Sequence, residues 1–168
     1  LEQVILHELG HVLGIGTIWA LQGLLEEPTD PVGPINDTWF SGALATAAFE
    51  AIGGDEYDDG DVVPVENDNT RFGEGSLNRH WRESVFGNEL MTPAIGFGAS
   101  PLSVVTSESL RDLGYEVDSA AADPFFFSFA DLVDPDRAGL IILENDVWQG
   151  SIEVTDEQGR VTGSFSTG

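Results

Sequence analysis

The first apolar pattern along the chain has the spacing of a helix. Residues 2–13 contain one glycine, Gly10, and no proline. Apolar side chains fall mostly on one helical face of this stretch: Val4, Ile5, Leu9, Val12 and Leu13. Apolar residues that recur every three or four positions are typical of an amphipathic helix. We therefore expect a buried helix over 2–13, followed by an exit at Gly14 and Gly16, which allow backbone angles that other residues disfavour.

Two more helices are predicted further along. Residues 39–52 are rich in alanine and aromatic side chains and end at a pair of glycines, so they predict a second helix. Residues 106–113 predict a short third helix that begins at a capping hydroxyl, Thr106 or Ser107, and ends at a glycine. The two predicted helices are separated by polar and glycine-containing segments that are typical of loops.

The remaining pattern predicts short strands. Residues 62–65 and 140–143 are apolar and short, and residues 151–165 alternate around a turn at 156–159, as a hairpin does. An aromatic run at 125–127 is expected to cover the edge of a core. Trp19, Trp39 and Trp81 are likewise expected in the core rather than in a substrate pocket, because buried packing is the usual role of aromatic residues.

Composition narrows the function classes. A chain of 168 residues with 41% hydrophobic residues can bury the core of one ordinary domain. Its formal net charge of -24, from 30 Asp and Glu against six Arg, would repel nucleic acid and anionic membrane surfaces. Solubility or high salt explains this acidity, and the alternative is Ca²⁺ bound by the acidic run 55–61. The chain has no apolar run long enough to cross a bilayer.

The most specific chemistry lies in the first predicted helix. His7 and His11 are four residues apart, so on a helix both imidazoles project from one face and can bind one metal ion. Glu8 stands beside His7, where it could take a proton from a water on that ion. The alternative is that two unrelated histidines share a helix, since this motif is short. The chain has no cysteine, so a zinc ion would be held by histidine and carboxylate side chains.

A third ligand is available in His80. The chain has three histidines, two of them in the motif, and a catalytic zinc site commonly uses three protein ligands. His80 follows a polar, irregular segment, and loops often deliver functional side chains. Its other interpretation is an incidental loop histidine beside Trp81.

These motifs resemble the metzincin peptidases. The run HELGHVLGIG has their His-Glu-x-x-His-x-x-Gly start, but the position three residues after Gly14, where most of them have the third histidine, is Thr17. A long insertion before the third histidine distinguishes the leishmanolysin family, and here the stretch 15–79 precedes His80. Met91, eleven residues after His80, matches the Met-turn of that family. Five segments together resemble bacterial leishmanolysin-like peptidases: HELGHVLGIGTIW, VPVEN, HWRESVFGNELMT, DLGY and AAADP.

The resemblance implies a secreted or cell-surface zinc metalloendopeptidase that hydrolyses protein or peptide substrates with a zinc-bound water activated by Glu8. It implies an α+β, mainly helical, metzincin-like catalytic domain, with the Met91 turn beneath the three imidazoles. Residues 1–127 would be the C-terminal part of that domain, and residues 128–168 a β-rich tail or linker. Because Leu1 lies within the apolar periodicity and is not preceded by a Met, we expect an excerpt that lacks the N-terminal sheet subdomain.

Two other functions remain open. The first is a catalytically incomplete zinc-binding module with a role in adhesion or assembly within a larger secreted protein. An intact Glu8 argues against it, because a purely structural zinc site needs no base. The second is a zinc hydrolase that acts on a non-peptide bond.

Overall fold

The computed structural model describes residues 1–57, 61–96, 98–127, 141–143, 151–156 and 158–166. Within these ranges the protein is a small α+β fold, which confirms the predicted class at that level. Its α-helices are α1 (Glu2–Val12), α2 (Ala43–Ala51), α3 (Asn69–Phe72), α4 (Glu83–Phe86) and α5 (Val104–Asp112). Its strands are β1 (Leu25–Glu26), β2 (Trp39–Phe40), β3 (Val63–Pro64), β4 (Ala94–Ile95), β5 (Ile141–Ile142), β6 (Ser151–Thr155) and β7 (Val161–Ser166).

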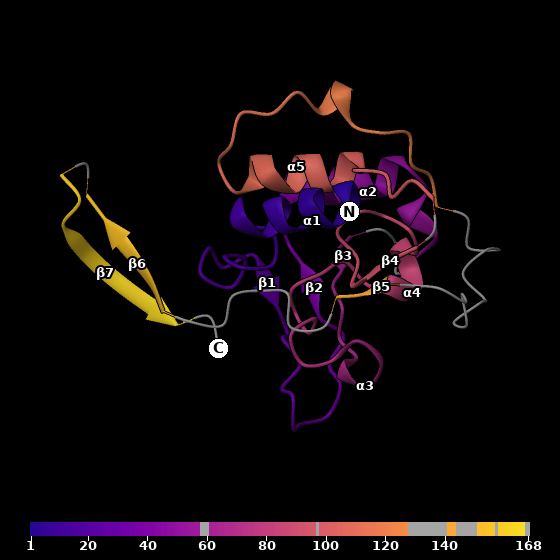
Figure 1. Ribbon diagram of the computed structural model, residues 1–168. Helices are drawn as coiled ribbons and strands as arrows, with labels where there is room; N and C mark the ends of the chain where they lie inside the picture. Colours follow the sequence, from indigo (N-terminus) through magenta and orange to yellow (C-terminus); the bar gives the residue numbers. More distant parts are fainter. Residues whose placement is uncertain (58–60, 97, 128–140, 144–150, 157, 167–168) are drawn as a thin grey trace.

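The strands form three small antiparallel sheets. The first has the order β1-β2-β3, with Leu25 opposite Phe40 and Trp39 opposite Pro64. The others are the pairs β4-β5 and β6-β7. Helices α1, α2 and α5 gather above the short strands β1–β3 (Figure 1), and α2 packs against α5. Long irregular segments join these elements, so side-chain packing contributes more to their placement than ladder hydrogen bonds do.

The core contains a cluster of buried aromatic rings. The rings of Trp19 and Trp81 stack with centroids 4.7 Å apart, and Phe86 stacks on Trp81 at 5.5 Å. Trp19 and Trp81 are fully buried, which confirms their predicted place in the core, whereas Trp39 is half-buried. The run 125–127 covers the edge of this core through its first and last phenylalanines, as predicted.

The starts of two helices differ from the prediction. Helix α2 begins at Ala43 and not at residue 39, because Trp39 and Phe40 pair with the strands on both sides of β2. Helix α5 begins at Val104, because Ser103 is its cap: the Ser103 Oγ accepts a hydrogen bond from the Thr106 N–H at 3.2 Å. The predicted caps, Thr106 and its neighbour, lie inside the helix.

The prediction of a buried helix over 2–13 was wrong in one respect. Helix α1 forms over Glu2–Val12, but Ile5, Leu9 and Val12 on its apolar face are 52%, 50% and 80% exposed. The buried face carries His7, Gly10 and His11 instead. The helical periodicity is confirmed, but the side of α1 that faces the core is the polar one. On that side the rings of His7 and His11 bond to backbone carbonyls.

The C-terminal part of the described chain contains the strand predicted at 140–143 and the hairpin predicted at 151–165. Strand β5 lies within the predicted 140–143 and pairs with β4, and the Leu143 N–H donates to the Pro93 carbonyl at 3.0 Å. This pairing crosses the boundary predicted at residue 127, and residues 128–140 lie outside the described part. Strands β6 and β7 form the predicted hairpin, which lies to one side of the other elements in Figure 1.

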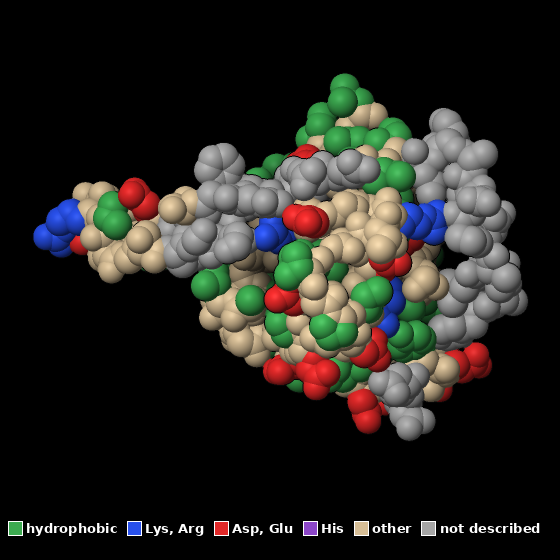
Figure 2. Space-filling model, turned by 90° about the horizontal axis from the view of Figure 1, so that it is seen from below, with side chains coloured by type: hydrophobic (Ala, Val, Ile, Leu, Met, Phe, Trp, Pro, Cys, Tyr) green, Lys and Arg blue, Asp and Glu red, His purple; other side chains and the backbone are tan. Residues whose placement is uncertain are grey.

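Among charged residues, the chain has many more acidic than basic ones, 30 Asp and Glu against six Arg. In the space-filling view, Asp and Glu side chains are scattered over the face that is shown and basic ones are few (Figure 2). No helix in the described ranges is both long and apolar enough to cross a membrane.

The turn of the β6-β7 hairpin should respond to acid. The Asp156 carboxylate accepts hydrogen bonds from the backbone N–H groups of Arg160 and Gln158 and from the Arg160 side chain. The Arg160 backbone N–H is the main reason that the pKa of Asp156 lies below its ordinary value of 3.8. Because the pKa is lower in the folded hairpin, this stabilisation is present above 3.8 and is lost as the pH falls through the folded pKa. Cross-strand NMR contacts should weaken over that range, and Asp156→Asn should remove this pH dependence.

Candidate metal centre

Helix α1 brings the first two histidines together. His7 and His11 are one helical turn apart and both are buried. Their Nε2 atoms lie 2.9 Å from each other. The motif therefore forms one cluster, as the spacing predicts.

His80 reaches the same point from the segment between α3 and α4. Its ring is fully buried, and its Nε2 lies 3.2 Å from that of His7 and 3.0 Å from that of His11. The main chain on both sides is anchored: the His80 carbonyl accepts from the Glu66 N–H at 2.8 Å, and the Trp81 N–H donates to the Met91 carbonyl at 3.0 Å. The structure thus brings all three predicted ligands into contact.

The other ring nitrogen of each histidine faces a backbone carbonyl. The acceptors are the carbonyls of Leu90, 2.7 Å from His7 Nδ1, Ile15, 2.8 Å from His11 Nδ1, and Ser76, 3.1 Å from His80 Nδ1. A carbonyl oxygen only accepts, so in each neutral ring the proton sits on Nδ1 and the lone pair sits on Nε2. The short distances between Nε2 atoms are therefore not hydrogen bonds. Three lone pairs aimed at one point would repel each other unless a cation lies between them.

The geometry fits a small metal ion. A tetrahedral ion with metal–nitrogen bonds of about 2.0–2.1 Å places its nitrogens about 3.3 Å apart, slightly more than the distances here. The three ligand atoms lie within 4.8 Å of one another, close enough to hold one ion. Three protein ligands leave a fourth position of a tetrahedron for a water or a substrate atom.

Met91 packs directly against α1 beside the histidines. Its side chain is fully buried, and a Cβ built on Gly10 would lie 2.5 Å from the Met91 sulfur. The glycine between His7 and His11 therefore allows the Met91 side chain to approach the helix. Met91 was predicted as the residue beneath the imidazoles, and in the structure it contacts the turn of helix that carries them.

A second close approach joins the two ligand-bearing segments. A Cβ on Gly16 would overlap the Arg79 carbonyl, and Gly16 has a φ of 70°. The chain leaving α1 can therefore pass the residue that precedes His80. The Thr17 hydroxyl donates to the His11 carbonyl at 3.0 Å and holds the same turn.

Glu8 lies on α1 beside His7 and is half-buried. It is therefore one position away from the ligand face and retains access to solvent. The acidic run 55–61, the candidate for Ca²⁺, includes residues 58–60, which lie outside the described part of the chain.

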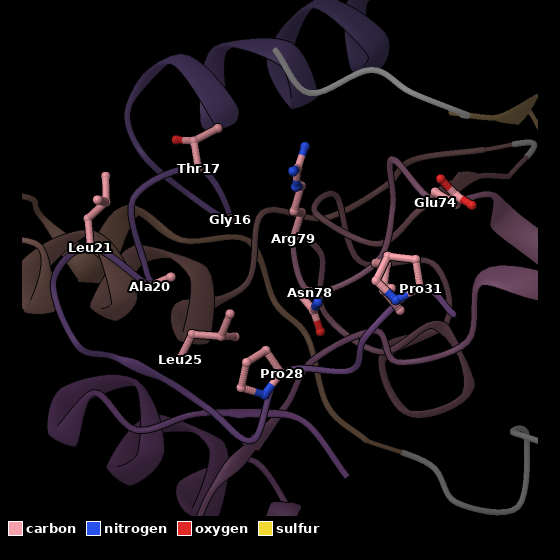
Figure 3. A pocket seen from close by; sticks show the side chains of 11 residues that line it. Gly16, Thr17, Ala20, Leu21, Leu25, Pro28, Pro31, Glu74, Asn78 and Arg79 are labelled. Carbon is pink, nitrogen blue, oxygen red and sulfur yellow. The ribbon is translucent and has the colours of Figure 1, made fainter. Parts of the chain in front are cut away.

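A pocket of about 430 Å³ lies next to the segments that hold His11 and His80. Its apolar wall includes Leu21, Leu25 and Leu77, and its polar groups include Glu74 and Arg79. In Figure 3 the residues after α1 and those that precede His80 stand on either side of it.

The groups that the sequence did not reveal are mainly backbone atoms. The carbonyls of Ile15, Ser76 and Leu90 orient the three rings, and any residue type supplies a carbonyl. Gly10 and Gly16 are the signals in the sequence that could have indicated where segments pass closely.

No protein-family model matches the chain, and neither the curated proteins nor the solved structures contain a match to it.

Substitution of Gly10 by alanine tests the contact with Met91. In an ordinary helix this change stabilises the protein by up to about 1 kcal/mol. Here the new methyl group would overlap the Met91 sulfur, so the free energy of unfolding should fall by about 1–3 kcal/mol, as overpacking does. Thermal and urea denaturation of the parent protein and of Gly10→Ala measure whether the free energy of unfolding falls or rises. A rise in stability would show that Met91 does not pack on α1.

Proposed function

We propose that this chain is the zinc-binding, catalytic part of a metalloendopeptidase of the leishmanolysin-like, metzincin type. The observation that carries the proposal is the convergence of the Nε2 atoms of His7, His11 and His80, from two distant segments, with every Nδ1 bonded to a carbonyl. Protein or peptide chains would be the substrates, and the protein would act outside the cell.

The choice of zinc rests on the chemistry of the donors. Three neutral imidazoles with one position left over are a common ligand set for catalytic zinc. Imidazole also suits copper, iron and nickel, so metal analysis has to distinguish these ions. When bound, zinc would polarise the scissile carbonyl and lower the pKa of a water at the open position.

Glu8 would serve as the general base. It is on the same helix as His7 and His11, one residue from the first ligand, and is half-buried rather than enclosed. A carboxylate there can take the proton of the attacking water and later deliver it to the amine that leaves. A site with a purely structural role has no use for such a group.

Two further features support a peptide substrate. The pocket of about 430 Å³ beside the ligand-bearing segments has an apolar wall that could receive a side chain of the substrate. The segment from His80 to Thr92, one of the five that resemble the leishmanolysin-like peptidases, contacts α1 through Met91.

The proposal makes a quantitative prediction for two variants. Purified protein should bind about one zinc ion per chain, measured by elemental analysis. His80→Ala should weaken zinc binding by more than the roughly 10–100-fold caused by loss of a group that only supports a ligand. Glu8→Gln should keep the zinc and lower cleavage of a casein-type substrate by about 10²–10⁴-fold, the usual contribution of a general base.

Each result has a distinct meaning. Protein that binds no zinc after reconstitution would contradict the metal site and with it the peptidase. Zinc binding without any cleavage that depends on Glu8 would instead favour the metal-binding module in adhesion or assembly. Asp112→Asn is a suitable folding control, because Asp112 caps α2 through the N–H groups of Leu44 and Ala45, a different helix from the one that carries His7 and His11.

A further inference from the structure

Glu89 is a buried carboxylate that the peptidase mechanism above does not use. It is 0% exposed. Its two oxygens accept four hydrogen bonds, all from neutral donors of the protein: Met91 N–H, Ser103 N–H, Ser103 Oγ–H and Thr106 Oγ1–H. Burial of a carboxylate is costly unless its hydrogen bonds are satisfied, so this group must stabilise an arrangement that an apolar side chain would not specify.

The four donors divide between the two oxygens. Oε2 accepts from the Met91 N–H, and Oε1 accepts from both donors of Ser103 and from the Thr106 hydroxyl. One oxygen thus holds the Met91 turn, and the other is fixed to the first turn of α5. Burial raises the pKa of Glu89 above its ordinary value, and the four donors offset part of that rise. The donors all point at the carboxylate, which suits its ionised form.

The segment held by Glu89 contacts the metal ligands directly. The Leu90 carbonyl accepts the His7 Nδ1 proton, and the Met91 carbonyl accepts from the Trp81 N–H, next to His80. The Met91 side chain packs on α1 at Gly10. Residues 89–91 therefore contact His7 and the neighbour of His80 at the same time.

Glu89 is also linked to Trp81, the neighbour of His80, through the Thr106 hydroxyl. The Trp81 indole N–H donates to the Thr106 Oγ1 at 2.7 Å, and that hydroxyl donates onward to Glu89. Trp81 is thus held by its backbone through Met91 and by its side chain through Thr106. Both restraints converge on Glu89.

We propose that Glu89 is a positioning residue that fixes His7 and His80 relative to each other by anchoring the Met91 turn and Trp81 to α5. The inference rests on the proposed function, in which these histidines are metal ligands. Glu89 does not touch the ion or the substrate, and its effect passes through the Leu90 carbonyl and the main chain of Trp81.

Glu89→Gln tests this role with minimal change of shape. The amide has one accepting oxygen, so if that oxygen keeps the three donors of α5, the NH₂ group faces the Met91 N–H and that bond is lost. Zinc affinity, measured by chelator competition, should fall about 10–100-fold. The visible spectrum of the cobalt-substituted protein, which reports ligand geometry, should change. In the metal-free protein, hydrogen exchange at the Trp81 amide should accelerate at least about 10-fold, as expected where local opening becomes easier.

Asp112→Asn is the matched control, because it also replaces a hydrogen-bonded carboxylate by an amide, but its bonds go to α2, through the N–H groups of Leu44 and Ala45, and not to the Met91 turn. If Glu89→Gln alters Trp81 exchange, the cobalt spectrum and zinc affinity no more than this control, Glu89 only stabilises the fold and the proposal is overturned. If the parent protein binds no metal, the proposed function fails, yet Trp81 exchange still decides the positioning role.

Thr106→Val is the second variant, in case Glu89→Gln does not fold. It is nearly isosteric and removes the link between Glu89 and the Trp81 indole while leaving the Met91 N–H bonded. Accelerated exchange at Trp81 with weaker zinc binding would support the proposal. Unchanged exchange and affinity would contradict it.

Discussion

The candidate site depends on one constraint: each of the three imidazoles donates its Nδ1 proton to a main-chain carbonyl. This fixes the tautomer, so that every Nε2 lone pair is turned toward the same point. The carbonyls belong to Ile15, Ser76 and Leu90, in three separate segments of the chain. The rings can converge only when all three segments are in place, so folding and assembly of the ligand set are one process.

That constraint explains the unusual orientation of α1. An amphipathic helix commonly buries its apolar face, yet here Ile5, Leu9 and Val12 are half or more exposed while His7 and His11 are buried. The inward face must admit Met91 as well as two imidazoles, and Gly10 provides the space for its sulfur. The stabilisation that apolar burial would give on this helix is replaced by ring hydrogen bonds and by contacts with Met91.

The ligands could be predicted from the sequence, whereas their support could not. His7 and His11 follow from helical spacing, and His80 follows because the chain has a third histidine and three ligands are common. Helices α1, α2 and α5 and the β6-β7 hairpin also follow from local pattern, whereas the four-residue helices α3 and α4 were not predicted. The start of α2 does not, since Trp39 and Phe40 favour a strand only when β1 and β3 flank them. Carbonyl acceptors leave no signal in a sequence, because every residue has one.

A sparse sheet explains why so many charged groups are buried close to His80. Strands β1–β5 are two residues long, and such strands supply few ladder hydrogen bonds. Buried side chains supply comparable links: the Glu66 carboxylate accepts from the N–H groups of Asn67, Asp68 and Glu83, and the Arg82 guanidinium donates to the carbonyls of Val65 and Thr38. Each of these two buried side chains disfavours other positions of the loops it bonds, because moving a loop would leave a buried charge without hydrogen-bond partners. The loops around His80 thereby gain the rigidity that longer strands would otherwise provide, in a chain with no disulfide.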